Sequence, residues 1–196
     1  MNVQEATTRR LPDLKERHLP ENCRETINTI LKETYGYEQF RNLEIYDDLS
    51  KGKEKLCISQ GQLIENVILE AEKAWKGETQ VDNILLTAPT GSGKSLLFQL
   101  PAIYLGKEYN LLTIVVSPLK ALIVDQVESL QELGYMRVAY ASSDLSPEQK
   151  MEVYRQVREG EIDLFYLSPE LLLSYDIKHF VGERRIGLVV VDEAHT

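Results

Sequence analysis

The sequence predicts an α/β fold, in which a doubly wound, mainly parallel sheet is flanked by helices and preceded by a helical N-terminal segment. From residue 83 onward, short and nearly continuous apolar runs alternate with amphipathic stretches of about three turns. Uninterrupted apolar runs are typical of strands that are buried on both faces, as in parallel sheets. Their regular alternation with helices indicates a doubly wound domain.

Five apolar runs are expected to form the strands. They are NILLTA (83–88), LLTIVVS (111–117), RVAYA (137–141), IDLFYLS (162–168) and IGLVVVD (186–192). Helices are expected at 119–133 and at 147–159, where Ser146 provides a cap and Pro147 stands in the first turn. Ahead of these, apolar residues at helical spacing indicate two more helices, one ending at Gly36 and one at Gly77.

The composition limits the kind of protein. With 196 residues, 43% of them hydrophobic, the chain can bury one substantial core. Its net charge of -9 does not indicate nucleic-acid binding, which needs clustered Lys and Arg, so any such contact is expected to be local. Cys23 and Cys57 are too few for a zinc site or a disulfide framework. The sequence shows neither an apolar leader nor an apolar run of membrane length, so we expect a cytoplasmic protein.

The strongest functional signal follows the first apolar run. It is a phosphate-binding loop of the A-x-x-x-x-G-K-S type, made of Ala88, Pro89, Thr90, Gly91, Ser92, Gly93, Lys94 and Ser95. The glycines let successive N–H groups point at phosphates, and the positive end of the following helix faces the same anion. Lys94 adds charge for the outer phosphates, and the Ser95 hydroxyl is a ligand for Mg²⁺. The loop therefore predicts nucleotide binding.

An acidic pair follows the last apolar run. Asp192 and Glu193 stand at the carboxyl end of the expected strand, where ligands of doubly wound sheets bind. Asp192 is suited to hold the Mg²⁺ that Ser95 also contacts, and Glu193 to orient and deprotonate an attacking water. Alone the pair is a weak signal, but downstream of a phosphate loop it predicts nucleotide hydrolysis.

Together these motifs and four other segments resemble superfamily 2 DEAH-box helicases and, among them, the ATP-dependent DNA helicases of the RecQ family. The four segments are ETYGYEQFR (33–41, motif 0), SLLFQLPAI (95–103), SPLKAL with DQV (117–127, motif Ia) and YLSPELL (166–172, motif Ib). The acidic pair itself is part of DEAH (192–195, motif II). The similarity runs from about residue 30 to 196. It implies a P-loop NTPase fold of the RecA-like type, with ATP and Mg²⁺ as cofactors.

The residue pattern and the resemblance together indicate how the chain is organised. Residues 1–20 would form a polar arm, and residues 81–196 the first RecA-like ATP-binding domain, incomplete at its C-terminal end. Between them, 21–80 would be a helical segment that contains motif 0. Residues 42 to about 59 are charged and irregular in pattern, and we interpret them as an insertion that splits motif 0.

Three residues would bind the base of the nucleotide if the resemblance holds residue by residue. Tyr37 and Arg41 would stack on adenine, and Gln62 would read its edge through two hydrogen bonds. The family glutamine follows the arginine within a few residues, where this chain has Glu44. Gln60 and Glu44 therefore stay open as alternatives to Gln62.

Nucleic-acid contacts are implied at two other strand ends. Ser117, Pro118 and Lys120 after one strand, and Ser168 and Pro169 after another, would touch the sugar–phosphate backbone. Hydroxyls, backbone N–H groups and a lysine suit contacts that do not depend on base sequence. Ser-Pro pairs also favour turns, so a purely structural role is the alternative.

The resemblance implies an ATP-dependent DNA helicase motor that moves 3′ to 5′, with DNA as its partner, single-stranded or at a duplex junction. His195 would link the nucleotide site to a second motor domain. We expect residues 1–196 by themselves to bind ATP–Mg²⁺ weakly, to hydrolyse it slowly and to separate no duplex. A DEAH-type RNA helicase and an ATP-gated clamp without strand separation are the alternatives. DNA repair and recombination, or a plasmid or phage-defence system with accessory proteins, would be the setting.

Overall fold

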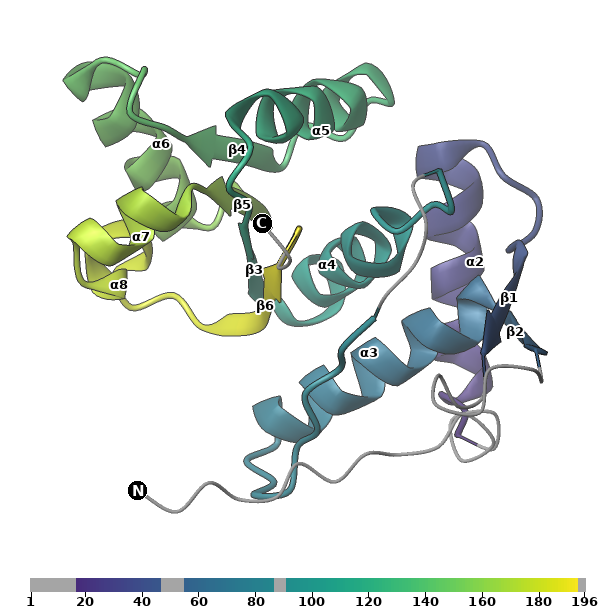
Figure 1. Ribbon diagram of the computed structural model, residues 1–196. Coiled ribbons are helices and arrows are strands. Elements are labelled where there is room, and N and C mark those ends of the chain that lie inside the picture. The colour runs from purple at the N-terminus through teal and green to yellow at the C-terminus, as the bar shows by residue number, and fades with distance from the viewer. Residues whose placement is uncertain (1–16, 47–54, 87–90, 194–196) are drawn as a thin grey trace. The chain divides into compact units, whose positions relative to one another are not determined.

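The computed structural model describes residues 17–46, 55–86 and 91–193, which form two compact units (Figure 1). Unit 1 comprises the residues up to 29 together with 37–101, and unit 2 comprises 30–36 together with 102–196. The domain limits expected at residues 20 and 80 both lie within unit 1, so that organisation stays a prediction.

Unit 1 is built from helices and one antiparallel pair of strands. Its elements are most of α2 (Glu21–Tyr35), β1 (Asn42–Tyr46), β2 (Lys55–Ser59), α3 (Gln60–Trp75) and the start of α4 (Leu96–Tyr109). The helix expected before Gly36 is confirmed, and Gly36 follows it with a φ of 69°. The helix expected before Gly77 is confirmed as α3, which begins at Gln60 because Ser59 caps it and forms a capping box with Gln62.

The described residues of the charged stretch, 42–46 and 55–59, are not irregular, so the sequence interpretation is wrong for them. β1 pairs with β2 in a register that runs from Asn42 opposite Ser59 to Tyr46 opposite Lys55. NLEIY alternates polar and apolar residues over a few positions only, and KLCIS has three apolar residues in a row, so neither segment has a clear period-2 pattern beside the charged run. The pairing brings together the two ends of the stretch that we interpret as an insertion.

The expected strand NILLTA is also wrong for the residues that the structure describes. Residues 83–86 are not part of a strand, while residues 87 and 88 lie outside the described ranges. Ile84 and Leu85 are 48% and 87% exposed. An apolar run supplies the composition of a strand, but its backbone also needs a hydrogen-bonding neighbour, which the composition does not specify.

Unit 2 contains a four-stranded, fully parallel sheet in the order β4-β5-β3-β6. Its strands are β3 (Leu112–Val116), β4 (Val138–Ala141), β5 (Leu164–Leu167) and β6 (Ile186–Val191), and its helices are the rest of α4, α5 (Lys120–Glu132), α6 (Pro147–Glu159), α7 (Pro169–Ser174) and α8 (Ile177–Val181). The other four expected strands and the helices at 119–133 and 147–159 are therefore confirmed, whereas α7 and α8 were not expected.

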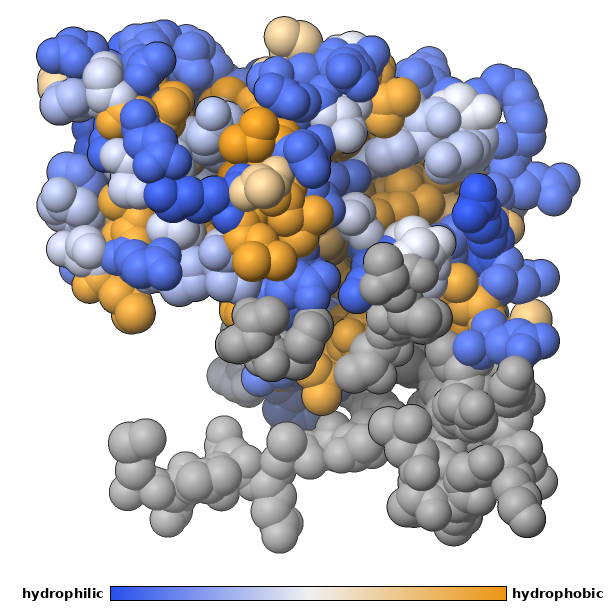
Figure 2. All heavy atoms as spheres, turned by 45° about the horizontal axis from the view of Figure 1, so that its top comes forward, coloured by the Kyte–Doolittle hydropathy of each residue, from blue (hydrophilic) through white to orange (hydrophobic). Residues whose placement is uncertain are grey.

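The core of unit 2 lies between the sheet and its helices. Every residue of β3 and β5 is buried, as their uninterrupted apolar runs predicted. Phe165 of β5 and Phe180 of α8 are fully buried, and both rings contact Tyr154 of α6 edge-on. Figure 2 shows hydrophilic residues around smaller apolar areas on one face of the surface.

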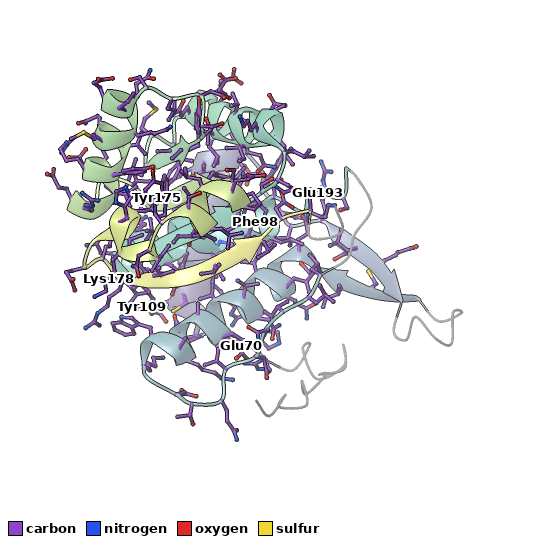
Figure 3. All side chains as sticks on the ribbon, turned by 60° about the vertical axis from the view of Figure 1, so that its left-hand side comes forward. Glu70, Phe98, Tyr109, Tyr175, Lys178 and Glu193 are labelled. Carbon is purple, nitrogen blue, oxygen red and sulfur yellow. The ribbon has the colours of Figure 1, made fainter. Side chains whose placement is uncertain are left out.

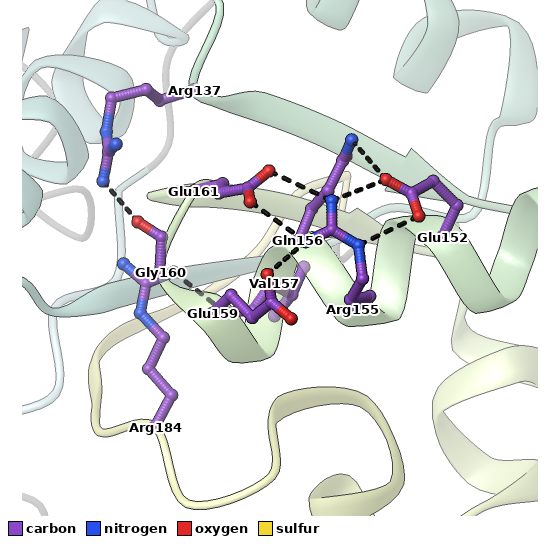
Figure 4. Close-up of polar contacts among 9 residues, drawn as sticks. All are labelled: Arg137, Glu152, Arg155, Gln156, Val157, Glu159, Gly160, Glu161 and Arg184. Atoms are coloured by element: carbon purple, nitrogen blue, oxygen red, sulfur yellow. Dashed lines mark hydrogen bonds and ion pairs between the residues drawn. The ribbon is translucent and has the colours of Figure 1, made fainter.

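A buried carboxylate joins the ends of several elements in unit 2. Asp163 accepts hydrogen bonds from Arg137 Nε at 2.6 Å, from Arg184 Nη2 at 3.0 Å and from the Tyr135 hydroxyl at 3.0 Å. Arg137 also donates to the Gly160 carbonyl at 2.7 Å, at the end of α6, where surface ion pairs surround Arg155 (Figure 4). Two arginines thus neutralise one buried charge and connect the segments before β4, β5 and β6.

Candidate nucleotide site and nucleic-acid edge

The described part of the phosphate loop leads directly into α4. Gly91 and Gly93 have φ values of 79° and 78°, which glycine adopts without strain. The Gly93 carbonyl accepts the Leu96 N–H at 3.2 Å and the Ser95 carbonyl accepts the Gln99 N–H at 2.9 Å, so helical hydrogen bonding begins inside the loop. The remaining loop residues, Ala88, Pro89 and Thr90, lie outside the described ranges.

This local geometry suits a phosphate chain. Two glycines with positive φ, followed by the first turn of a fourteen-residue helix, present backbone N–H groups and a helix N-terminus to an anion. Lys94 is half-buried between them, where its ammonium adds a compact positive charge. The loop can therefore hold the phosphates of a nucleotide with backbone groups and one lysine.

The two residues assigned to the adenine ring lie together at the start of the split motif. Tyr37 is 48% exposed, and the Arg41 guanidinium carbon lies 5.9 Å from the centre of its ring. That distance is within the range of a cation–π contact. The side chains thus present an aromatic face and a planar cation, both of which stack on bases.

Of the three candidate polar residues, the structure brings Gln60 to the phosphate loop. Its Nε2 donates to the Ser92 carbonyl at 3.3 Å, and its Oε1 accepts the Arg41 N–H at 3.1 Å. Gln62 instead accepts the Ser59 N–H at 3.2 Å in the capping box. Glu44 is exposed on β1. The hairpin places Gln60 beside Arg41, a proximity that the sequence alone does not show.

A cavity of about 230 Å³ lies in unit 1 beside the start of α3. Its walls include the Phe40 ring, Gly61 and Gln62, together with the polar face of α2 around Arg24. A methyl group on Gly61 would come within 2.7 Å of the Phe40 ring, so only glycine lets this ring pack against α3. The Phe40 ring and Gln62 thus line the same cavity.

The acidic pair stands at the carboxyl edge of the sheet in unit 2, next to the other strand ends. The Asp192 N–H donates to the Val116 carbonyl at 2.9 Å, and the Ser117 N–H donates to the Leu167 carbonyl at 3.1 Å. Glu193 follows at the end of β6 (Figure 3), and its N–H donates to Asp192 Oδ1 at 3.0 Å. This edge is the place where doubly wound sheets bind ligands.

Glu193 has a φ of 53°, an unusual value for a residue with a side chain. Strained conformations of this kind cluster at functional sites. His195 lies outside the described ranges. Ser95 belongs to unit 1 and Asp192 to unit 2, so their joint binding of Mg²⁺ stays a prediction, although both offer the oxygen ligands that Mg²⁺ prefers.

The residues expected to touch nucleic acid differ in exposure. Ser117 and Ser168 are only 1% and 4% exposed, and Ser168 Oγ accepts the Leu171 N–H at 3.3 Å as the cap of α7. Ser117 Oγ is buried without a hydrogen-bond partner in the part of the chain that the structure describes. Pro118 and Pro169 are half-buried. Solvent thus reaches the prolines more readily than the serine hydroxyls.

Lys120 is exposed but is held by two residues that the sequence analysis missed. Its Nζ lies 2.5 Å from Ser143 Oγ and 2.9 Å from Asp144 Oδ1. The hydrogen bond and charge of Lys120 hold the pKa of Asp144 below its usual value. Ser143 and Asp144 follow the expected strand RVAYA, so the rule that ligands lie beyond strand ends would have found them.

A parallel sheet with an acidic pair at its carboxyl edge and a glycine-rich phosphate loop ahead of a helix define a P-loop nucleotide-binding protein. The sequence profile of DEAD/DEAH box helicases matches residues 61–196, and the chain belongs to this family. The RecA-like, doubly wound architecture expected from the sequence is confirmed.

Known relatives extend the similarity over most of the chain. It is 33% identical over 174 residues to the ATP-dependent DNA helicase RecQ of Synechocystis, which covers 88% of this chain and 30% of that protein. It is 34% identical over 172 residues to the ATP-dependent DNA helicase Q-like 5 of Arabidopsis thaliana, covering 87% of this chain and 15% of the relative. The RecQ helicase of Bacillus subtilis is 32% identical over 85% of this chain and 23% of its own length. The resemblance to RecQ helicases is thereby confirmed, and the chain spans less than a third of these relatives.

None of the helices in the described ranges combines the length and the apolar character required to cross a membrane.

Proposed function

We propose that the chain is the ATP-binding portion of a RecQ-like motor that moves 3′ to 5′ on DNA and separates duplexes. The phosphate loop carries the proposal, because Gly91 and Gly93 have the backbone conformation that such a loop needs and α4 follows at once. The relatives named as DNA helicases favour DNA over RNA as the partner.

The residues of unit 1 would bind the nucleotide. The loop N–H groups and Lys94 would hold the phosphates, while Tyr37 and Arg41 would stack on the base. A base between these two side chains needs about 7 Å, twice a contact of about 3.5 Å, so the pair would have to open slightly from its 5.9 Å separation. Gln62 would leave the Ser59 N–H to read the edge of adenine.

The residues of unit 2 would hydrolyse ATP and contact DNA. Asp192, with Ser95, would hold Mg²⁺, which neutralises charge on the phosphates when bound. Glu193 would orient the attacking water and accept its proton, and His195 would pass the state of the site to a second motor domain.

The DNA contact would depend more on backbone groups than on hydroxyls. The N-cap of α5 is Leu119, which makes no side-chain cap, whereas Ser146 and Ser168 cap α6 and α7. The first-turn N–H groups of α5 would therefore suit a DNA phosphate next to Pro118 and Lys120. Ser117, Ser168 and Pro169 would shape the same edge.

A strand-displacement assay tests this function. The natural protein that carries this sequence is mixed with matched DNA and RNA duplexes that have 3′ or 5′ single-stranded tails. We expect displacement of DNA with a 3′ tail, dependent on ATP and Mg²⁺. Displacement of RNA alone would identify an RNA helicase, and ATP-dependent binding without displacement would identify a clamp. Failure to bind ATP at all would contradict the proposal in every form.

A further inference from the structure

We infer that Gln60 is a positioning residue that holds the phosphate loop in its binding conformation and ties it to the adenine-binding half of the site. The inference rests on the proposed function, because it concerns how the same nucleotide is bound. It goes beyond that function by assigning to Gln60, which the sequence left open as a base-reading residue, the positioning of the phosphate loop.

Both polar atoms of the Gln60 side-chain amide have a hydrogen-bond partner. The residue is 2% exposed, so unpaired polar atoms would be costly there. Its Oε1 accepts the Arg41 N–H at 3.1 Å, and its Nε2 donates to the Ser92 carbonyl at 3.3 Å. Its backbone N–H also donates to the Arg41 carbonyl at 2.9 Å. Gln60 therefore bridges the base of the hairpin and the phosphate loop.

The bond to Ser92 fixes the direction of a loop N–H group. In a trans peptide the carbonyl of one residue and the N–H of the next point to opposite sides. Since the Ser92 carbonyl faces Gln60, the Gly93 N–H points away from Gln60. A methyl group on Gly93 would come within 2.7 Å of Gln60 Nε2, so the amide lies directly against the loop. Gln60 thus preorganises this peptide before a phosphate arrives.

The hairpin makes the link between the two halves of the site. β1 and β2 carry the chain away from Arg41 and return it to Gln60, the first residue of α3. Through its Oε1, Gln60 anchors the residue that contacts the Tyr37 ring, and through its Nε2 it anchors the loop. The phosphate loop and the base-stacking pair are therefore positioned by one side chain.

The test compares two ligands and four variants of the 196-residue chain. The affinities of ATP–Mg²⁺ and of inorganic tripolyphosphate–Mg²⁺ are measured by calorimetry for the wild type, Gln60→Ala, Gln60→Glu and Tyr37→Ala. Gln60→Glu keeps the acceptor for Arg41 but replaces the donor to Ser92 with a negative oxygen. Gln131→Ala, an exposed glutamine on α5, is the matched control.

We expect both Gln60 variants to weaken both ligands by the same factor, about ten-fold, because the loop itself is disturbed. Tyr37→Ala should weaken ATP alone, and Gln131→Ala should change neither. Wild-type affinities in folded Gln60 variants would overturn the inference, and so would a loss for ATP without a loss for tripolyphosphate, which would make Gln60 a base reader. Unfolding of both variants, seen by circular dichroism, would also overturn it in favour of a structural role. If the wild type binds neither ligand, the proposed function fails instead.

Discussion

Arg41 and Gln60 lie 19 positions apart in the chain, yet the Gln60 N–H is 2.9 Å from the Arg41 carbonyl and the Arg41 N–H is 3.1 Å from Gln60 Oε1. The strands that follow Arg41 and precede Gln60 form an antiparallel pair. The stretch that we interpret as an insertion therefore begins and ends at the same place, and it leaves Arg41 and Gln60 in contact.

The first prediction concerns the hairpin itself. Replacement of residues 44–57 by the turn Asn-Gly should leave ATP affinity within about two-fold of the wild type, because a two-residue turn can join the paired residues Leu43 and Ile58 and the buried Ile58 is retained. Equilibrium binding of ATP–Mg²⁺ measures the effect. A folded but non-binding variant would show that the hairpin contributes contacts of its own.

Lys94 should be indispensable for nucleotide binding. Lys94→Ala removes the compact charge beside the phosphate loop, and we expect a loss of ATP affinity of at least about 100-fold, with loss of turnover in the natural protein. Lys107→Ala is the control, because it removes the same charge from an exposed position at the end of α4. Equal affinities for the two variants would show that the loop does not bind phosphate.

Gln62 has two possible roles, capping α3 and recognising adenine, and one substitution distinguishes between them. Gln62→Glu keeps an acceptor for the Ser59 N–H, so the free energy of unfolding should change by less than about 0.5 kcal/mol. A carboxylate cannot donate to the edge of adenine, so the preference for ATP over GTP should fall by about ten-fold. An unchanged preference, measured by competition binding, would remove Gln62 from the base site and leave it as a cap.

The ion pair with Asp144 should weaken the binding of Lys120 to DNA. Asp144→Asn removes the carboxylate 2.9 Å from Lys120 Nζ, and we expect the affinity for single-stranded DNA to rise by about two- to five-fold at low salt. Lys120→Ala should lower it. Glu128→Gln, which makes the same charge change at an exposed position of α5, serves as the control for net charge.

The pH dependence of this contact has a definite sign. Lys120 lowers the pKa of Asp144, so the ion pair persists above the usual titration range of a carboxylate and is lost as the pH falls through the lowered value. The difference in DNA affinity between Asp144→Asn and the wild type should therefore shrink at acidic pH. A difference that grows on acidification would contradict the assignment.

Asp163 should be a major contributor to the stability of unit 2. Asp163→Asn leaves Arg137 and the buried Arg184 without their shared carboxylate, and we expect a loss of about 3–5 kcal/mol in the free energy of unfolding. Urea denaturation measures it. Glu161→Gln, at an exposed ion pair with Arg155, should cost less than about 1 kcal/mol. Similar losses in the free energy of unfolding for both variants would show that the buried network contributes no more stability than an exposed ion pair.

Much of the fold was readable in the sequence because its signals are local. The apolar runs that form β3 and β5 are buried on both faces. They can therefore be predicted as strands without knowing which strand lies next to them. Ser146 and Pro147 marked the start of α6 by capping chemistry that depends on neighbouring residues only. The phosphate loop and the acidic pair were recognisable for the same reason, since their spacing along the chain carries the chemistry.

The features that were missed depend on pairing across long separations. The strands of the hairpin are five residues each, too short to be identified before Asn42 is placed opposite Ser59. The run from Asn83 failed as a strand over residues 83–86 because composition does not provide a neighbouring backbone.

The sequence by itself determined the family, the phosphate loop and the parallel sheet of this protein, because each rests on residues close together in the chain. The tertiary structure decided which glutamine contacts the loop and what holds Lys120. Gln60 reaches Ser92 only because the hairpin closes at Arg41, and Asp144 reaches Lys120 only because β4 and β3 end at the same edge of the sheet. A hydrogen bond requires atoms about 3 Å apart, and only the folded chain brings these residues to that distance.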